Sequence, residues 1–252
     1  MADTRRPVTR LCRYDDKRMY IREHDVSQLM GKVGFTDVMI LDILGRFPTP
    51  AERTIVDAVL VGLIEHGMSP SAIAARMAIM SAPESLQGAV CAGLQSVGSV
   101  LVGSLENCAA LLGEIVAADD VDAASRRAAE RHKAERRPIP GFGHPHFKPD
   151  DPRTVRLFAL VDELKLPGRH KRAAESLSRA VDAVYGKHLT VNSSMGMAVA
   201  LSEIGFPPAI MRGLAVICRA AGLVAHIHEE MNDPAGWTVM RAAGEAVPYD
   251  AG

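Results

Sequence analysis

The chain has 252 residues, of which 48% are hydrophobic and 23% are charged, and its formal net charge at pH 7 is −1. This composition is ordinary for a globular protein and gives enough residues for one large domain or two small ones. Nucleic-acid binders usually carry a basic surface, and aromatic residues make up only 4% of this chain, so we expect no nucleic-acid partner.

The sequence also lacks the usual signs of a membrane or secreted protein. No apolar run approaches the roughly 18 residues of a membrane span, and no apolar signal core follows the polar N-terminus. The four cysteines are far apart and form no CxxC pair, which is typical of reduced thiols. We therefore expect a cytoplasmic protein with no membrane partner.

Taken in chain order, most of the sequence is predicted to be helical, and a short hairpin could lie between Arg13 and Arg22. Thr49-Pro50-Ala51-Glu52 predicts a helix start, because it places a glutamate three residues after a capping threonine and a proline in the first turn. The spacing of a buried helical stripe follows this start and recurs twice further on. Its members are Val56, Val59, Leu60 and Leu63, then Leu157, Leu160, Val161 and Leu164, and then Leu177, Ala180, Val181 and Val184.

Three further segments complete the predicted secondary structure. Gly98 and Gly103 are expected inside a long helical run, where small residues permit close helix packing. Residues 117–137 begin with acidic residues and are rich in alanine, arginine and glutamate, which predicts a solvated helix. Pro207-Pro208 is expected to begin an apolar helix that runs toward His226.

Residues 140–153 form the segment best suited to chemistry. Within it, Gly141-Phe142-Gly143-His144 is followed by Lys148 and Arg153. Glycine permits positive φ and close approach of a ligand to the backbone, and histidine exchanges protons near neutral pH. Lysine and arginine bind phosphate and carboxylate. The segment therefore predicts a site that holds and protonates an acidic substrate.

Several other polar residues allow more than one interpretation. His66 ends an apolar helix, where the helix dipole alone would favour a histidine in the last turn. Arg219 lies in an apolar stretch and needs either an intramolecular ion pair or an anionic ligand. His144 and His146 have no further ligand-type residues nearby, so we expect no metal. Residues 226–230 contain two histidines and two glutamates and are predicted to form a solvated helix face.

Together these segments resemble the citrate synthase superfamily, and in particular the small citryl-CoA lyase-like proteins related to the lyase module of ATP-citrate lyase. The resemblance covers nearly the whole chain and is carried by residues 44–52, 65–67, 98–106, 141–153, 219–222 and 249–252. It implies an all-α fold with a large helical domain (1–103 and 206–252) and a smaller one (104–205). It also implies an active site that belongs to a homodimer or a higher homo-oligomer.

The resemblance further implies roles for individual residues. The catalytic residues would be His144, His66 and Ser194, and the substrate carboxylates would be bound by His66, Arg153, Arg219 and Arg241, the last donated by a partner subunit. Coenzyme A would be held by Arg137, Ile139, Pro140, Gly141, Phe142, Gly143 and Lys148. Coenzyme A is then part of a thioester substrate, and no tightly bound cofactor is expected.

The sequence departs from the family pattern at three positions. Leu101 stands where full citrate synthases carry a histidine, which favours the lyase branch. Ser194 stands where the family's Asn-Val-Asp motif supplies the catalytic aspartate, in a register fixed by Gly205-Phe206-Pro207. Unactivated serine is a poor acid or base near pH 7. Pro145 replaces an arginine that usually follows the histidine of the loop.

The predicted function is reversible cleavage of citryl-CoA, or of a related 3-hydroxyacyl-CoA, to acetyl-CoA and oxaloacetate. This reaction needs a histidine such as His144 to accept the hydroxyl proton or to polarise the carbonyl, arginines for the carboxylates, and an acid for the enolate. Two alternatives remain. One is a retro-Claisen or condensing enzyme that acts on a different acyl-CoA, and the other is a non-catalytic member that binds citrate or CoA.

Overall fold

The computed structural model describes residues 6–98, 100 and 103–250 of the chain. Ser99, Leu101 and the last two residues of the expected C-terminal motif lie outside the described residues. The backbone divides into two compact units, Met1–Asp57 and Ala58–Gly252. The division predicted from the sequence, with boundaries after residues 103 and 205, stays a prediction.

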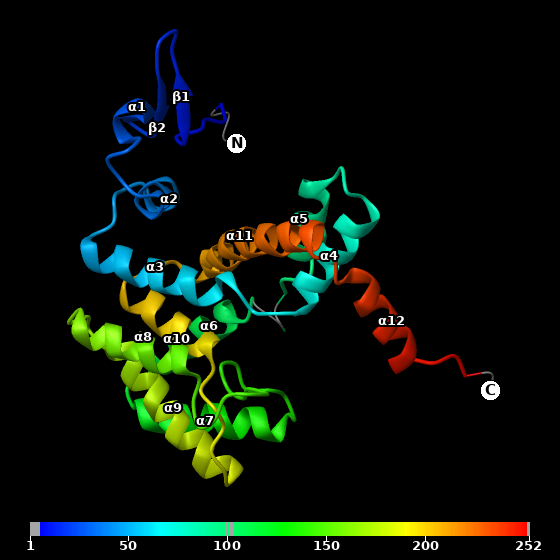
Figure 1. The fold of residues 1–252 in the computed structure, drawn as a ribbon. Helices are drawn as coiled ribbons and strands as arrows, with labels where there is room; N and C mark the ends of the chain where they lie inside the picture. The colour runs from blue at the N-terminus through cyan, green and yellow to red at the C-terminus, as the bar shows by residue number, and fades with distance from the viewer. Residues whose placement is uncertain (1–5, 99, 101–102, 251–252) are drawn as a thin grey trace. The chain divides into compact units, whose positions relative to one another are not determined.

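The first unit contains a small antiparallel sheet with the strand order β1-β2-β3 (Figure 1). Arg13 pairs with Tyr20 across the first two strands, which confirms the hairpin predicted between Arg13 and Arg22. A third strand and two helices follow it. The bounds are β1 (Cys12–Tyr14), β2 (Met19–Ile21), β3 (His24–Asp25), α1 (Val26–Leu29) and α2 (Phe35–Leu44).

The helix predicted from Thr49-Pro50 is α3 (Pro50–Ile64), and its start is a capping box. The Glu52 amide donates to Thr49 Oγ1 at 3.2 Å, and the Thr49 amide donates to Glu52 Oε2 at 2.7 Å. Arg46 pairs with the same carboxylate at 2.6 Å and lowers the pKa of Glu52 to about 2. The sequence therefore predicted the beginning of this helix and its capping residues, whereas the pairing of Arg46 with Glu52 is seen only in the structure.

The second unit is built from helices, which confirms the predicted all-α fold. Its elements after α3 are α4 (Pro70–Ser81), α5 (Leu86–Leu94), α6 (Leu105–Val116), α7 (Val121–Ala134), α8 (Pro152–Glu163), α9 (Arg169–Tyr185), α10 (Ser193–Glu203), the short 3-10 helix η1 (Pro208–Ile210), α11 (Met211–Asn232) and α12 (Gly236–Ala246). The two later apolar stripes predicted from the sequence lie on α8 and α9.

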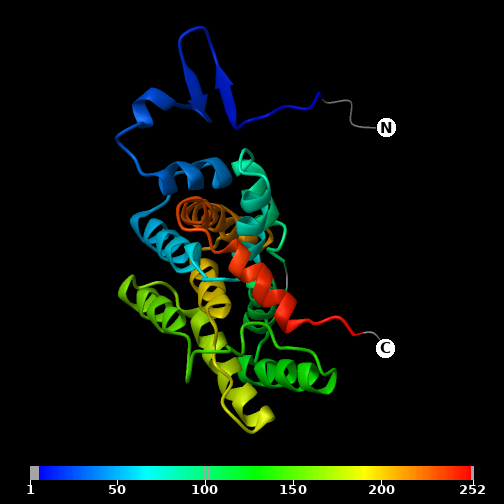
Figure 2. The ribbon, with the colours of Figure 1, turned by 45° about the vertical axis from the view of Figure 1, so that its right-hand side comes forward.

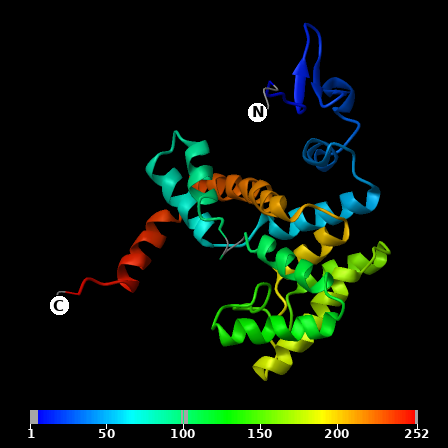
Figure 3. The same cartoon turned by 180° about the vertical axis from the view of Figure 1, so that it is seen from behind.

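Helix α10 is the centre of one group of helices in this unit. It packs against α6, α8 and α9, and α7 lies along α9 (Figure 2). Most of its side chains are fully buried, including Met195, Met197 and Leu201. A second group forms where α11 packs on α4 and α5 (Figure 3). Helix α12 contacts α4 and then leads away from the end of α11.

Two predictions about local structure need correction. The helical run expected through Gly98 and Gly103 is wrong, because α5 ends at Leu94 and the next helix begins at Leu105. The Gly103 amide donates to the Gly98 carbonyl at 3.0 Å, so the two glycines close a turn. Within residues 117–137 the expected helix is α7 (Val121–Ala134), but it buries one face, including His132, and is not solvated all round.

Helix α11 also differs from the expectation that no stretch is long and apolar enough to span a membrane. Residues 208–232 have a mean hydropathy of 1.6 over an 18-residue window. Half of that window is buried inside the protein, and the core helix of a globular domain passes the same test. The helix predicted from Pro207-Pro208 therefore exists, and its apolar character is explained by its packing on α4 and α5.

A close backbone approach in the second unit lies where α11 crosses the end of α3. A Cβ atom placed at Gly222 would lie 1.9 Å from the Ile64 carbonyl oxygen, which real contacts essentially never permit. Only glycine therefore allows the two helices to meet at this point. The crossing holds the residues after Ile64 against the middle of α11.

We predict that Gly222→Ala lowers the free energy of unfolding by about 1–3 kcal/mol, because overpacking at backbone forces the helices apart. Gly213→Ala is the matched control on the same helix, since a Cβ there meets nothing within 4 Å. It should leave stability unchanged or raise it by up to about 1 kcal/mol through helix propensity. Urea unfolding of both variants measures the difference, and equal stabilities would contradict the close approach.

Candidate active site

A cleft of about 1160 Å³ opens in the second unit where several helix ends meet. It is lined by the end of α3 and the loop after it, the loop before α6, the glycine-bracketed loop, the starts of α8 and α10, and α11. The lining residues are 61–63, 65–71, 96, 100, 104, 142–147, 153, 192–194 and 219. The cleft thus brings together seven residues singled out from the sequence, which are His66, Phe142, Gly143, His144, Arg153, Ser194 and Arg219.

The loop that carries His144 is held by backbone contacts with the segment before α10. The Gly143 amide donates to the Thr190 carbonyl at 2.7 Å, and the Asn192 amide donates to the Gly141 carbonyl at 2.9 Å. Both loop glycines have positive φ, +85° and +89°. At Gly141 a Cβ would also lie 2.6 Å from the Met195 side chain, so this position requires glycine for conformation and for space.

The hydrogen bonds of His144 indicate the tautomer of its neutral ring. Nδ1 accepts from the amides of His146 at 3.1 Å and Phe147 at 3.0 Å. Backbone amides only donate, so the neutral ring carries its proton on Nε2. Burial is the main cause that lowers the pKa of His144, and the nearby Arg153 contributes. His144 is therefore arranged as a neutral donor that polarises an oxygen.

Arg153 is positioned by Asp151, the fully buried residue that caps α8. The Asp151 carboxylate accepts from the Arg153 side chain at 2.7 and 3.0 Å and from the Ser193 amide at 3.2 Å. Burial disfavours the charge on Asp151, but the hydrogen bonds from Arg153 more than offset it, so its pKa lies below the ordinary value. One carboxylate thus joins the starts of α8 and α10.

Arg219 is 1% exposed and is the largest fully buried side chain in the protein. Its Nη1 donates to the Ile64 carbonyl at 3.5 Å, and its Nε has no hydrogen-bond partner among the described residues. No ion pair of Arg219 is found in that part of the chain, although Glu65 lies near enough to favour its charge. Of the two explanations left open by the sequence, the geometry favours an anionic ligand over an intramolecular ion pair.

His66 lies in the loop after α3, two residues beyond the last helical residue. The expectation of a histidine in the last helical turn is therefore wrong. Burial lowers the pKa of His66, and the positive charges of Arg153 and Arg219 lower it further. A neutral imidazole beside two guanidinium groups can accept a proton from a substrate hydroxyl.

The predicted solvated face at residues 226–230 is also wrong in part, because His226 and Glu230 are buried. Arg76, itself 3% exposed, donates to His226 Nδ1 at 3.0 Å and to Glu230 at 2.9 Å, and it also pairs with Glu229. His226 Nε2 in turn lies 3.1 Å from Glu65 Oε2. The network fixes Glu65 at the edge of the cleft. Sequence analysis did not predict the network, because Glu65 and Arg76 are about 150 residues away from His226 and Glu230 along the chain.

Ser194 lies in the first turn of α10 and is half-buried. Its Oγ lies 2.6 Å from the Oγ of Ser104, the residue that precedes α6. Ser104 was not recognised in the sequence as a site residue, and nothing in the residues around it indicates its contact with Ser194. A pair of hydroxyl groups thus lies at the start of α10, where the sequence analysis expected a family aspartate to be replaced by Ser194.

The remaining predicted residues do not line the cleft. Arg137 and Lys148 are exposed on either side of the glycine-bracketed loop, and Arg241 is exposed on α12. Ile139, Pro140 and Gly141 lie within the loop behind the lining residues. Their predicted roles stay predictions. Among the described residues, no group of three or more His, Cys, Asp or Glu side chains could hold a metal ion.

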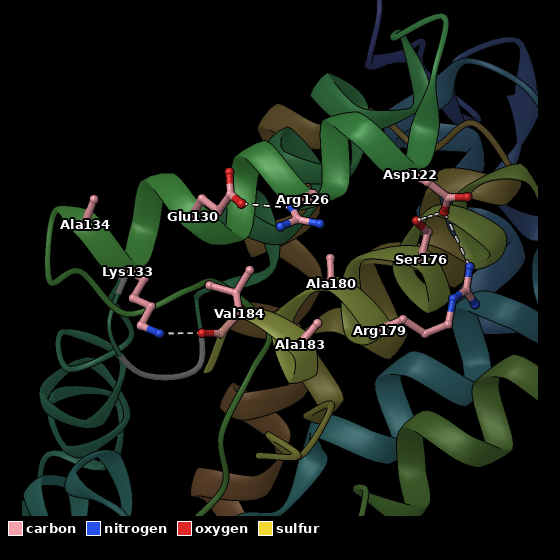
Figure 4. A pocket seen from close by; sticks show the side chains of 10 residues that line it. All are labelled: Asp122, Arg126, Glu130, Lys133, Ala134, Ser176, Arg179, Ala180, Ala183 and Val184. Carbon is pink, nitrogen blue, oxygen red and sulfur yellow. Dashed lines mark hydrogen bonds and ion pairs between the residues drawn. The ribbon is translucent and has the colours of Figure 1, made fainter. Parts of the chain in front are cut away.

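A second hollow of about 630 Å³ lies between α7 and α9 (Figure 4). Its charged side chains satisfy one another, since Arg126 pairs with Glu130 and Arg179 pairs with Asp122 (Figure 4). Lys133 donates to the Val184 carbonyl. This hollow presents no convergent, unpartnered group, so the larger cleft is the candidate site.

The chain is similar to known proteins over most of its length. The family model of the citrate synthase C-terminal domain matches residues 40–242, so the chain belongs to the citrate synthase family. The structure of citryl-CoA lyase from Hydrogenobacter thermophilus is 31% identical, with a TM-score of 0.86, and the match covers 98% of this chain and 96% of that one.

Two further relatives are longer proteins, and each match covers most of this chain but less than half of the relative. ATP citrate lyase from Methanothrix soehngenii, solved in complex with citrate and coenzyme A, shares the fold at 18% identity and a TM-score of 0.82, over 99% of this chain and 43% of that one. Glyoxysomal citrate synthase from Cucurbita maxima is 30% identical over 207 residues, 77% of this chain and 39% of that protein. The chain spans about half the length of the curated relatives it matches.

We predict opposite effects on stability for the two buried arginines. Arg76→Met should lower the free energy of unfolding by about 3–5 kcal/mol, because it leaves the buried Glu230 carboxylate unpaired. Arg219→Met should leave stability unchanged or raise it, because it removes a buried charge that has no ion pair in the folded protein. Chemical unfolding without ligand measures both. An equal loss in the two variants would show that Arg219 has a structural role.

Proposed function

We propose that this protein is a carbon–carbon lyase that cleaves citryl-CoA, or a related 3-hydroxyacyl-CoA, to acetyl-CoA and oxaloacetate. The observation that carries the proposal is Arg219, a buried cation in the cleft wall with an unpartnered Nε. An uncompensated buried charge is costly unless a ligand of opposite charge completes it. The carboxylates of citryl-CoA supply that charge.

The other cleft residues suit the same substrate. Arg153 offers a second guanidinium for a carboxylate, and arginine binds carboxylates in a two-pronged geometry. His144, with its proton on Nε2, would donate to the oxygen that becomes the carbonyl of oxaloacetate. His66, neutral and beside both arginines, would accept the hydroxyl proton as the carbon–carbon bond breaks.

Coenzyme A would enter as part of the thioester substrate. The proposal rests on residues 137–143, which lead into the cleft, and on the basic side chain of Lys148 next to it. It is supported by the shared fold with the Methanothrix ATP citrate lyase, which was solved with citrate and coenzyme A bound. A second copy of the chain would supply Arg241, so the proposal includes a homodimer. It also places the protein in the cytoplasm.

Two other functions use the same pocket. Ser194 at the aspartate position favours a protein that binds citrate or coenzyme A without turnover, because no carboxylate stands there. A retro-Claisen or condensing enzyme on a different acyl-CoA is the other candidate, since the cleft volume of about 1160 Å³ leaves room for a larger acyl group. The substrate range separates these candidates.

We predict that the purified protein releases oxaloacetate from citryl-CoA, and that His144→Ala lowers kcat by about 10²–10⁴-fold through loss of the polarising donor. His228→Ala is the control, because His228 is exposed on α11 outside the cleft. Coupled spectrophotometry of oxaloacetate measures the rate. No cleavage of any 3-hydroxyacyl-CoA in a panel, together with a rise in Tm with citrate or coenzyme A, would identify a binding protein instead.

We predict that kcat/KM stays level through neutral pH and falls only below the ordinary histidine pKa of about 6.5. His66 and His144 have lowered pKa values and act as neutral groups, so their function is lost as pH falls through those values. His188→Gln should show the same profile, because the imidazole of His188 lies outside the cleft and its pKa is raised by Asp182. A decline of kcat/KM that begins above pH 6.5 as the pH is lowered would contradict the assignment of His66 and His144 as neutral groups.

A further inference from the structure

The cleft needs an acid for the thioester enolate, and the usual carboxylate is absent. Glu65 is the only acidic side chain among the described residues that line it. Its Oε2 already accepts from the amides of His66 at 3.1 Å and Gly67 at 3.2 Å, and it lies 3.1 Å from His226 Nε2. Asp151 is fully occupied by Arg153 and the start of α10. The carboxylates near the cleft therefore already have other partners.

We propose that the hydroxyl pair Ser104–Ser194 is the proton donor to the enolate, with Ser194 as the catalytic acid and Ser104 as the residue that positions and reprotonates it. The inference rests on the proposed lyase function and adds a residue to it. The two Oγ atoms are 2.6 Å apart, and both side chains line the cleft.

The local structure of Ser104 supports a role other than helix capping. It occupies the N-cap position of α6, where a serine normally accepts hydrogen bonds from the first-turn amides and stabilises the helix. Here it makes no such bond, and its hydroxyl contacts Ser194 instead. In α10 the cap is supplied by Asn192, whose Oδ1 accepts from the Ser194 amide at 3.1 Å. The Ser194 hydroxyl is therefore not used for capping either.

The acidity of a hydroxyl is sufficient for this step. An alcohol is a far weaker acid than a carboxylic acid, but it is a stronger acid than the α-carbon of a thioester. Proton transfer from Ser194 to the enolate carbon is thus favourable. In the reverse direction, a neutral serine could not remove the α-proton of acetyl-CoA. As Ser194 gives up its proton, the proton of Ser104 moves to the Ser194 oxygen in the same step, and the developing negative charge is favoured by the positive ends of α6 and α10.

The complete step balances without a cofactor. The substrate hydroxyl gives its proton to His66, the carbon–carbon bond breaks, and its electron pair passes to the thioester as an enolate. The enolate carbon takes the Ser194 proton and becomes the methyl group of acetyl-CoA. Ser194 recovers a proton from Ser104, and Ser104 recovers one from water. His66 releases its proton to solvent, which returns the site to its starting state.

The test measures citryl-CoA cleavage by Ser194→Ala and Ser104→Ala, with Ser202→Ala on α10, outside the cleft, as the matched control. Ser194→Ala should lower kcat by about 10²–10⁴-fold with little change in KM. Ser104→Ala should lower it by about 10–100-fold, as expected for loss of a hydrogen bond to a charged oxygen. Ser104→Thr keeps a hydroxyl and should restore most of the rate, and Tm values establish that each variant is folded.

The proton inventory, which is kcat measured in mixtures of H₂O and D₂O, distinguishes proton transfer from a structural role. A purely structural role of Ser104 would not change its shape. With two serine protons in transit, kcat should depend on the deuterium fraction along a curve, and in Ser104→Ala along a straight line. Wild-type kcat values in both serine-to-alanine variants would overturn this inference alone. Failure of the wild-type protein to cleave any 3-hydroxyacyl-CoA would overturn the proposed function and this inference with it.

Discussion

The crossing of α11 over the end of α3 is the constraint on which the candidate site depends. Gly222 lets the Ile64 carbonyl approach the helix backbone, and Arg219, one turn earlier, donates to that same carbonyl. The chain leaves α3 at this point and continues directly to His66. A single contact between backbones therefore fixes the positions of both Arg219, the buried cation of the cleft, and His66 beside it.

Around this crossing, the fold assembles the cleft from helix ends. The Asp151 carboxylate caps α8, holds Arg153 and accepts from the first residue of α10, while Asn192 joins the same helix to the glycine-bracketed loop. Helix ends carry unpaired amides and partial charges, so they are natural places to hold anions. The result is a site with more positive than negative groups, which an anionic substrate would balance.

The sequence predicted much of this arrangement where the signal is local. The capping box at Thr49 and Glu52, the stripes of α8 and α9, and the residue types of the glycine-bracketed loop all depend on neighbours a few positions away. The prediction failed at Gly98 and Gly103, which lie outside the helices on either side of them. It failed again at His226 and Glu230, which are polar by sequence but buried because Arg76 compensates them.

The order of residues was enough to indicate which chemical groups are available, the mainly helical fold and the family that the chain resembles. The bonding of those groups became visible only in the folded structure, because the decisive partners are far apart in the chain. Ser104 and Ser194 are 90 residues apart, and Arg76 and His226 are 150 apart. Hydrogen bonds act over about 3 Å, so whether a serine has a partner, or an arginine lacks one, is fixed only when the helices pack.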